Sequence, residues 1–120
     1  MIYEFIDYKV YLRAYIKSKP KGGRGILSKL AASMNITSAQ LSHVMKGGRD
    51  FSPEQALKAA HFIGLTKTET FFFMELVAYA RAGTRDLREF SKAKLEELRA
   101  EGLQLKNQVP AHQALSDEER

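Results

Sequence analysis

The chain has 120 residues, no cysteine and a formal net charge of +5. This length suffices for one domain with a hydrophobic core, and the lack of cysteine excludes a disulfide framework and cysteine-based zinc fingers. No basic leader precedes the first predicted helix, and no apolar run approaches the roughly 20 residues that span a bilayer. We therefore expect a cytoplasmic protein without a membrane-spanning segment.

The positive charge is concentrated in the first half of the chain. No aspartate or glutamate occurs from Tyr8 to Arg49, whereas lysine and arginine recur throughout that stretch. Beyond His61, acidic side chains offset the basic ones. This asymmetry favours a partner with a phosphate backbone. The alternative is a solvated face with an incidental bias in sign.

The first predicted helix runs from about Asp7 to Lys19 and stops at Pro20, because proline disfavours a helical residue before it. One face is apolar and aromatic, as expected of a helix packed on a core, and the other carries a basic stripe of Lys9, Arg13 and Lys17. Basic helix faces also adhere to anionic membranes. Membrane adhesion is a minor alternative, and we expect no membrane partner.

Residues 28–49, SKLAASMNITSAQLSHVMKGGR, have the pattern of two short helices joined by a tight turn. In the turn, Asn35 can adopt the left-handed conformation that ends a helix, Ile36 fills the corner, and Thr37 can cap the next helix. Apolar residues at helical spacing form two stripes, one on each side of the turn, which we expect to face each other: Leu30, Ala31, Met34, Leu41, Val44 and Met45.

Small or polar side chains occupy the outer face of the second helix of this pair: Ser38, Gln40, Ser42, His43 and Lys46. Such groups can enter a DNA major groove without clashing. The pattern therefore predicts a DNA-reading helix. Any small helical bundle also contains helix pairs with polar outer positions, so helix pairing alone does not establish this function.

The tetrapeptide KGGR occurs twice, at residues 21–24 before the pair and at residues 46–49 after it. Glycine permits close backbone approach to a phosphate, and flanking cations add charge-assisted contacts. The first glycines can instead be a linker, and Gly47 can simply end a helix. Neither loop has the spacing of a nucleotide-binding P-loop. We predict that the DNA backbone is held by Lys21, Arg24, Thr37, Lys46 and Arg49.

Three more helices are predicted after the pair. Ser52, followed by proline and Gln55, is a strong helix start with a capping box, and Gly64 should end that helix. Thr66 should cap the next helix, over residues 67–82, and the last helix should run from residue 84 or 85 to about residue 100. The pattern then fades, which predicts an irregular, mobile tail over residues 101–120.

Phe71, Phe72 and Phe73 point in three directions about 100° apart on a helix. One small core cannot easily cover all three rings, so we predict that one of them meets a second copy of the chain. A homodimer built on the last two helices would place two reading helices about one DNA turn, near 34 Å, apart. The alternative is that the last helix and the tail cover all three rings within one chain.

No strand-like alternation is present. The sequence predicts an all-α bundle of five or six helices over residues 1–100, with a core motif at about 26–65 and additional helices at about 67–100, followed by the tail. LAASMNITSAQLSHVMKGGR and then SPEQALKAAHFIGL resemble the Cro/C1-type helix-turn-helix family, the lambda-repressor-like DNA-binding domains. The motif FxDYxxYL at residues 5–12 and ETFFFMELV at residues 69–77 resemble a paralogous bacterial family with such a domain at its N-terminus.

The resemblance to repressor domains implies that the helix over residues 38–46 reads DNA, with Lys46 on phosphate and four side chains toward bases: Ser38, Ala39, Ser42 and His43. The sequence departs from the family pattern in two places. Leu27 stands where a glutamine often contacts phosphate and braces the reading helix, and Asn35 replaces the usual turn glycine.

Base reading is weakly supported by the residue types on this helix. Ala39 offers only a methyl group, and no outward arginine or asparagine can make bidentate base contacts. Gln40 can read adenine only if the helix is rotated from the usual pose. We therefore expect sequence-tolerant or modestly specific binding to double-stranded DNA by a transcriptional regulator.

An enzyme is not expected. His43, His61 and His112 are scattered, and the sequence has neither a cysteine nucleophile nor clustered carboxylates. No metal or cofactor is therefore implied. The alternative to DNA binding is a protein-interaction adaptor that keeps the helical fold and binds a protein partner through Phe71, Phe72 and Phe73.

Overall fold

The computed structural model describes residues 1–112 as helices and connecting turns, and the side chains of residues 1–105. The described part of the chain is all-α, as the sequence predicted, and contains no strand. After a 3-10 turn, η1 (Ile2–Glu4), the α-helices in chain order are α1 (Tyr8–Lys17), α2 (Pro20–Gly23), α3 (Ile26–Ser33), α4 (Ser38–Met45), α5 (Pro53–Ile63), α6 (Lys67–Arg81) and α7 (Arg85–His112).

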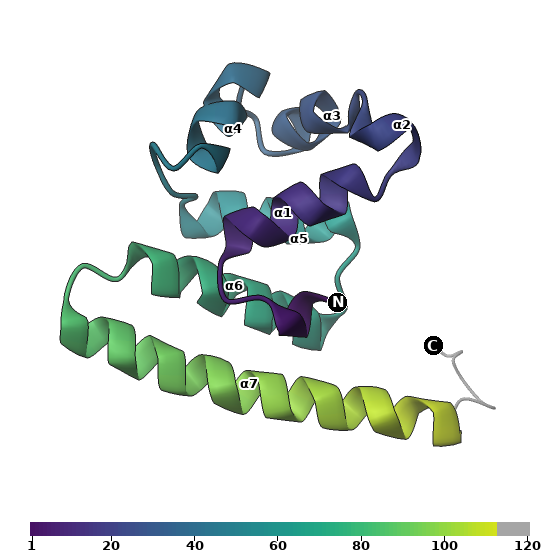
Figure 1. The fold of residues 1–120 in the computed structure, drawn as a ribbon, viewed down its shortest axis with the longest axis vertical. Helices are drawn as coiled ribbons and strands as arrows, with labels where there is room; N and C mark the ends of the chain where they lie inside the picture. The colour runs from purple at the N-terminus through teal and green to yellow at the C-terminus, as the bar shows by residue number, and fades with distance from the viewer. Residues whose placement is uncertain (113–120) are drawn as a thin grey trace.

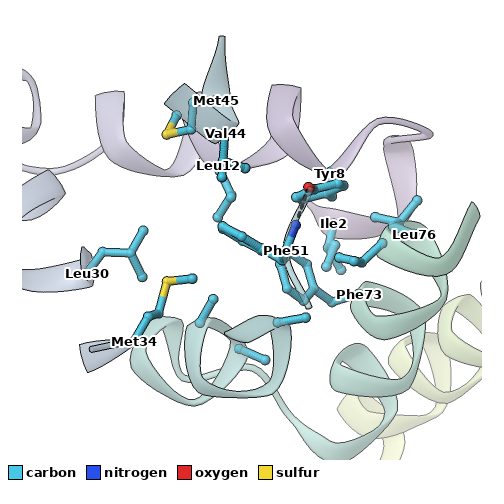
Figure 2. Close-up of a cluster of buried hydrophobic side chains, with 14 of the residues drawn as sticks. Ile2, Tyr8, Leu12, Leu30, Met34, Val44, Met45, Phe51, Phe73 and Leu76 are labelled. Carbon is cyan, nitrogen blue, oxygen red and sulfur yellow. Dashed lines mark hydrogen bonds between the residues drawn. The ribbon is translucent and has the colours of Figure 1, made fainter. Parts of the chain in front are cut away.

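The helices are arranged in successive layers. In Figure 1, α2, α3 and α4 lie on one side, α1 and α5 cross below them, and α6 and α7 follow as an antiparallel pair on the opposite side. The hydrophobic core lies between α1, α3, α4, α5 and α6, and Figure 2 shows Leu12, Phe51 and Phe73 converging there. α7 is the outermost helix of this arrangement.

Local signals place the ends of the later helices where the sequence predicted them. The Ser52 hydroxyl accepts a hydrogen bond from the Gln55 N–H at 3.1 Å, which caps α5. Gly64 ends α5 in the left-handed conformation, with φ of 86°. The Thr66 hydroxyl caps α6 in the same manner as Ser52. These predictions are confirmed.

The predicted end of the last helix is wrong. The sequence predicted an irregular tail from residue 101, whereas α7 continues to His112. Gly102 does not stop the helix, because it is a buried contact point: a Cβ there would lie 2.2 Å from the Tyr3 ring. The rest of the predicted tail, residues 113–120, lies outside the described residues. The described residues contain seven α-helices and not the predicted five or six, because α2 adds one tight turn of four residues in which Lys21 and Gly22 are left-handed, with φ of 60° and 68°.

Of the three consecutive phenylalanines predicted to form a dimer or partner surface, two lie in the core and one remains uncovered by its own chain. Phe72 and Phe73 are fully buried within the single chain, and only Phe71 is exposed, at 52%. The Phe72 ring meets the edge of Tyr3 at 5.1 Å between centroids, with the Arg99 guanidinium above it at 5.3 Å. No pattern in the sequence predicted η1, and this turn supplies the Tyr3 ring that covers Phe72.

Candidate nucleic-acid interface

α3 and α4 pack against each other through the two predicted stripes. All six stripe residues are buried, with exposures of 9% or less. Ile36, in the turn between the helices, is half-buried and packs against the core. This burial confirms the predicted pairing of two short helices across a tight turn, which leaves the opposite face of α4 free to form a site.

The turn between α3 and α4 has the predicted local geometry. Asn35 is left-handed, with φ of 60°, and its N–H donates to the Ala32 carbonyl at 3.1 Å. The Thr37 hydroxyl accepts from the Gln40 N–H at 3.0 Å, and the Gln40 carboxamide oxygen accepts from the Thr37 N–H at 2.8 Å. Both helix-end predictions are confirmed. The reciprocal bonds also engage Gln40 as a capping residue.

The outer face of α4 is open. Ser38, Ala39, Gln40, His43 and Lys46 are exposed, and Ser42 is half-buried. The side chains predicted to face DNA bases therefore share one accessible surface on a helix of eight residues. Ser38, Ala39 and Ser42 on this surface are small, so the walls of a DNA groove can approach the helix closely.

A serine pair links the beginnings of α3 and α4. The hydroxyl oxygens of Ser28 and Ser38 lie 3.3 Å apart. The sequence predicted no side chain that braces α4 from the beginning of α3, because Leu27 stands where the related pattern often has glutamine. Ser28, the next residue, makes this contact with a shorter side chain. A serine directly after Leu27 is the signal that could have identified it.

The second KGGR segment, residues 46–49, ends α4 through its two glycines. Gly47 is left-handed, with φ of 93°, and the Gly47 and Gly48 N–H groups donate to the Val44 and His43 carbonyls at 2.9 and 3.0 Å. This is the two-bond pattern of a glycine-ended helix. A Cβ on Gly48 would lie 2.2 Å from the His43 ring. The two glycines thus end α4 and let the imidazole lie flat against the loop.

Two cations of the basic stripe on α1 hold this same region. Lys9 donates to the Arg49 carbonyl at 2.6 Å and pairs with Asp50 at 3.2 Å. Arg13 donates to the Met45 carbonyl at the end of α4. A cation at a helix C-terminus also interacts favourably with the helix dipole. Lys9, which is half-buried, and Arg13, which stays exposed, therefore both bond to the end of α4 and the loop after it.

Tyr8 anchors the loop from below. Its buried hydroxyl donates to Asp50 Oδ1 at 2.8 Å and accepts from the Phe51 N–H at 3.0 Å, the second bond being visible in Figure 2. Burial is the main cause that raises the pKa of Tyr8 above its usual value, and the Asp50 carboxylate adds to the rise. Arg81 of α6 donates to the Phe51 carbonyl at 2.9 Å. Residues 49–51 are thus fixed to both α1 and α6.

The two KGGR segments lie at opposite ends of the α2–α4 layer (Figure 1). Their cations, Lys21, Arg24, Lys46 and Arg49, are all exposed. Among the described side chains, no carboxylate lies within ion-pairing distance of these four. The first segment is a structured turn and not a flexible linker, because Gly23 is packed against α1, where a Cβ would lie 2.2 Å from the Ile16 carbonyl oxygen.

A groove of about 490 Å³ runs beside α4 toward the beginning of α5. Its walls combine the outer face of α4 with the anchored loop, and two arginines, Arg49 and Arg81, line it. The other polar lining residues are Gln40, His43, Asp50, Ser52 and Gln55. The groove is continuous with the exposed face of α4 and belongs to the same candidate site.

Neither a metal-binding cluster of three His, Asp or Glu side chains nor a helix long and apolar enough to cross a membrane occurs in the described part of the chain. No family model matches the sequence, and no curated protein or solved structure matches it either.

Proposed function

We propose that the chain binds double-stranded DNA, with α4 in the major groove and the two KGGR segments on the phosphate backbone. One observation carries the proposal. The exposed polar face of α4 lies in a layer of helices, α2–α4, whose two ends carry cations that no described carboxylate neutralises (Figure 1). A duplex presents phosphates on both sides of its major groove, which matches this arrangement of charge around a helix.

The resemblance to Cro/C1-type domains supports the same orientation of α4. In that orientation Ser38, Ala39, Ser42 and His43 face the bases, while Thr37 and Lys46 lie near phosphate. The fixed position of residues 49–51 favours binding, because Arg49 is presented from a backbone that is already ordered. A protein of this type that occupies promoter DNA acts as a transcriptional regulator.

Sequence discrimination is expected to be modest. A bidentate adenine contact needs both the oxygen and the nitrogen of a glutamine side chain, and the Gln40 oxygen already accepts the Thr37 N–H. Serine hydroxyls accept and donate to several bases. His43 is the exposed side chain on α4 with the most distinctive hydrogen-bonding pattern, so we expect any preferred sequence to depend mainly on it.

Salt-dependent binding of the full chain to a labelled duplex tests the backbone contacts. Replacing Lys21, Arg24, Lys46 and Arg49 by alanine should weaken binding to all duplexes and reduce the slope of log affinity against log salt by about 3 to 4 units, at roughly 0.9 per lost phosphate contact. A control variant removes four exposed cations on α5–α7 and should keep most of the parent slope: Lys58, Lys67, Arg85 and Lys92. Equal affinity of parent and test variant at low salt would refute the contacts.

Selection from a random duplex pool tests base reading. Replacing Ser38, Gln40, Ser42 and His43 by alanine should change or abolish any preferred sequence, with His43→Ala alone producing most of the change. An unchanged preference in the fourfold variant would exclude α4 as the reading helix.

A protein-interaction adaptor is the second candidate function. The observation that favours it is exposed aromatic surface on the α6–α7 pair, where Phe71 is 52% and Phe90 is 73% exposed. Phe72 and Phe73 are buried and do not contribute to such a surface. An adaptor would show no salt-dependent retention on DNA, so the salt titration separates the two functions.

A further inference from the structure

α7 carries an exposed stripe that its own chain does not cover. Phe90 is 73% and Leu87 is 51% exposed, and Phe90 is the most exposed of the large apolar side chains described. The opposite side of the helix is the one that packs: Ser91 and Leu95 are buried, and the Ser91 hydroxyl donates to Glu75 of α6 at 2.6 Å. Figure 1 shows α7 as the outermost helix, with its far side free.

Helical geometry groups four exposed residues around Phe90. At 100° per residue, positions 3 and 4 before and after Phe90 lie within about 60° of its direction. Those positions hold Asp86, Leu87, Ala93 and Lys94, and all four are exposed. The stripe is therefore a band of apolar, small and charged groups with Phe90 at its centre.

This band is complementary to itself when it is reversed. In an antiparallel pair with a two-fold axis at Phe90, position 86 faces position 94 of the other copy, and position 87 faces position 93. Asp86 would then meet the other copy's Lys94, and Leu87 would pack on the other copy's Ala93. Because the axis repeats each contact, one Phe90–Phe90 contact would be flanked by two ion pairs and two large-on-small contacts.

We infer that this face of α7 binds a second copy of the chain, antiparallel, through residues 86–94. The charge pattern selects that partner and orientation. A parallel pair in register would place Asp86 beside Asp86 and Lys94 beside Lys94, and like charges in such positions are repulsive. The interface is small, so we expect a dissociation constant on the order of 10 µM.

The inference goes beyond DNA binding and does not depend on it. α7 lies on the side of the molecule opposite α4 (Figure 1), so the pairing leaves the candidate nucleic-acid interface uncovered. It also differs from the dimer predicted from the sequence, because it is centred on Phe90 and not on Phe71–Phe73. Oligomeric state, measured without DNA, is the direct readout.

Sedimentation velocity on the full chain from 1 to about 200 µM tests the inference. The parent should change from monomer to dimer across this range, and Phe90→Ser should raise the dissociation constant at least about thirtyfold, as expected for a central aromatic anchor. Phe71→Ser, which removes an exposed phenylalanine from α6, is the matched control and should leave the constant unchanged. A parent that stays monomeric, or a Phe71→Ser variant that dissociates while Phe90→Ser does not, would overturn the inference.

Charge reversal tests the orientation. Asp86→Lys and Lys94→Asp should each raise the dissociation constant about tenfold, because each change replaces two attractive contacts by two repulsive ones. The double variant restores both pairs with exchanged signs and should return close to the parent value. Exchanging Arg85 and Glu89, which pair within the chain at 3.2 Å, is the control and should have little effect. A double variant no better than the single variants would exclude this antiparallel register.

Discussion

The Tyr8 hydroxyl is the contact whose removal gives the clearest measure of how firmly the loop after α4 is held. Tyr8→Phe removes one oxygen from a fully buried side chain and leaves the ring packed on Phe51 and Phe73. Two hydrogen bonds are lost, one to the Asp50 carboxylate and one from the buried Phe51 N–H. The change therefore tests the polar anchor without opening a cavity.

The expected loss follows from these two bonds. A hydrogen bond to a charged group contributes about 1.5 to 3 kcal/mol, and a buried N–H without a partner costs about 1 to 3 kcal/mol. Asp50 is partly exposed and regains water, so the low end of the first range applies to its bond, and the buried Phe51 N–H adds about 1.5 kcal/mol. We expect the free energy of unfolding to fall by about 3 kcal/mol, which at a urea m-value of about 1.5 kcal/mol/M lowers the midpoint by about 2 M.

Urea unfolding followed by circular dichroism measures this change. Tyr11→Phe is the matched control, because none of the hydrogen bonds among the described residues uses the Tyr11 hydroxyl, and it should cost less than about 0.5 kcal/mol. Combining Tyr8→Phe with Asp50→Ala should give a coupling energy of at least about 1 kcal/mol. If the two tyrosine variants lose equal stability, the anchor does not stabilise the loop and the reasoning is refuted.

Three further predictions address the core, the alkaline limit and the turn. Phe72→Ala should destabilise the protein by about 3 to 5 kcal/mol and Phe71→Ala by less than about 1 kcal/mol in thermal melts, and equal losses would contradict their different burial. Burial, assisted by the Glu69 charge, raises the pKa of Tyr11 to about 12 from 10.0, so its proton is lost later in the folded state than in the unfolded state. The free energy of unfolding should therefore fall as pH rises from about 10 to 12, less steeply in Tyr11→Phe, and an equally steep fall in that variant would assign the effect elsewhere. At φ of 60°, Asn35→Ala should cost about 1 kcal/mol or more in urea unfolding, whereas Asn35→Gly should be nearly neutral, and a neutral alanine variant would show that the turn does not need the left-handed conformation.

Helix ends and the α3–α4 pair were predictable from the sequence because their causes are local. α3 ends through two local bonds, from the Asn35 N–H to a carbonyl three residues back and from the Ile36 N–H to a carbonyl five residues back. Thr37 caps α4 through a residue three positions away. Apolar residues at helical spacing identified the buried stripes for the same reason. The exposed face of α4 was predictable as well, because it consists of the residues that do not belong to the buried stripe.

Long-range contacts decided what the sequence pattern left open. Gly102 has the character of a helix end, yet it stays helical because Tyr3 packs on it from the other end of the chain. In the sequence, Lys9 and Arg13 have the spacing of a free basic stripe. In the fold, Lys9 bonds to the Arg49 carbonyl, 40 positions away, and Arg13 bonds to the Met45 carbonyl, 32 positions away. Which of three adjacent phenylalanines remains exposed depends on η1 and Arg99, the latter bonded to a carbonyl 96 positions away. Local periodicity sets the direction of each side chain, whereas the tertiary structure alone determines what lies in that direction.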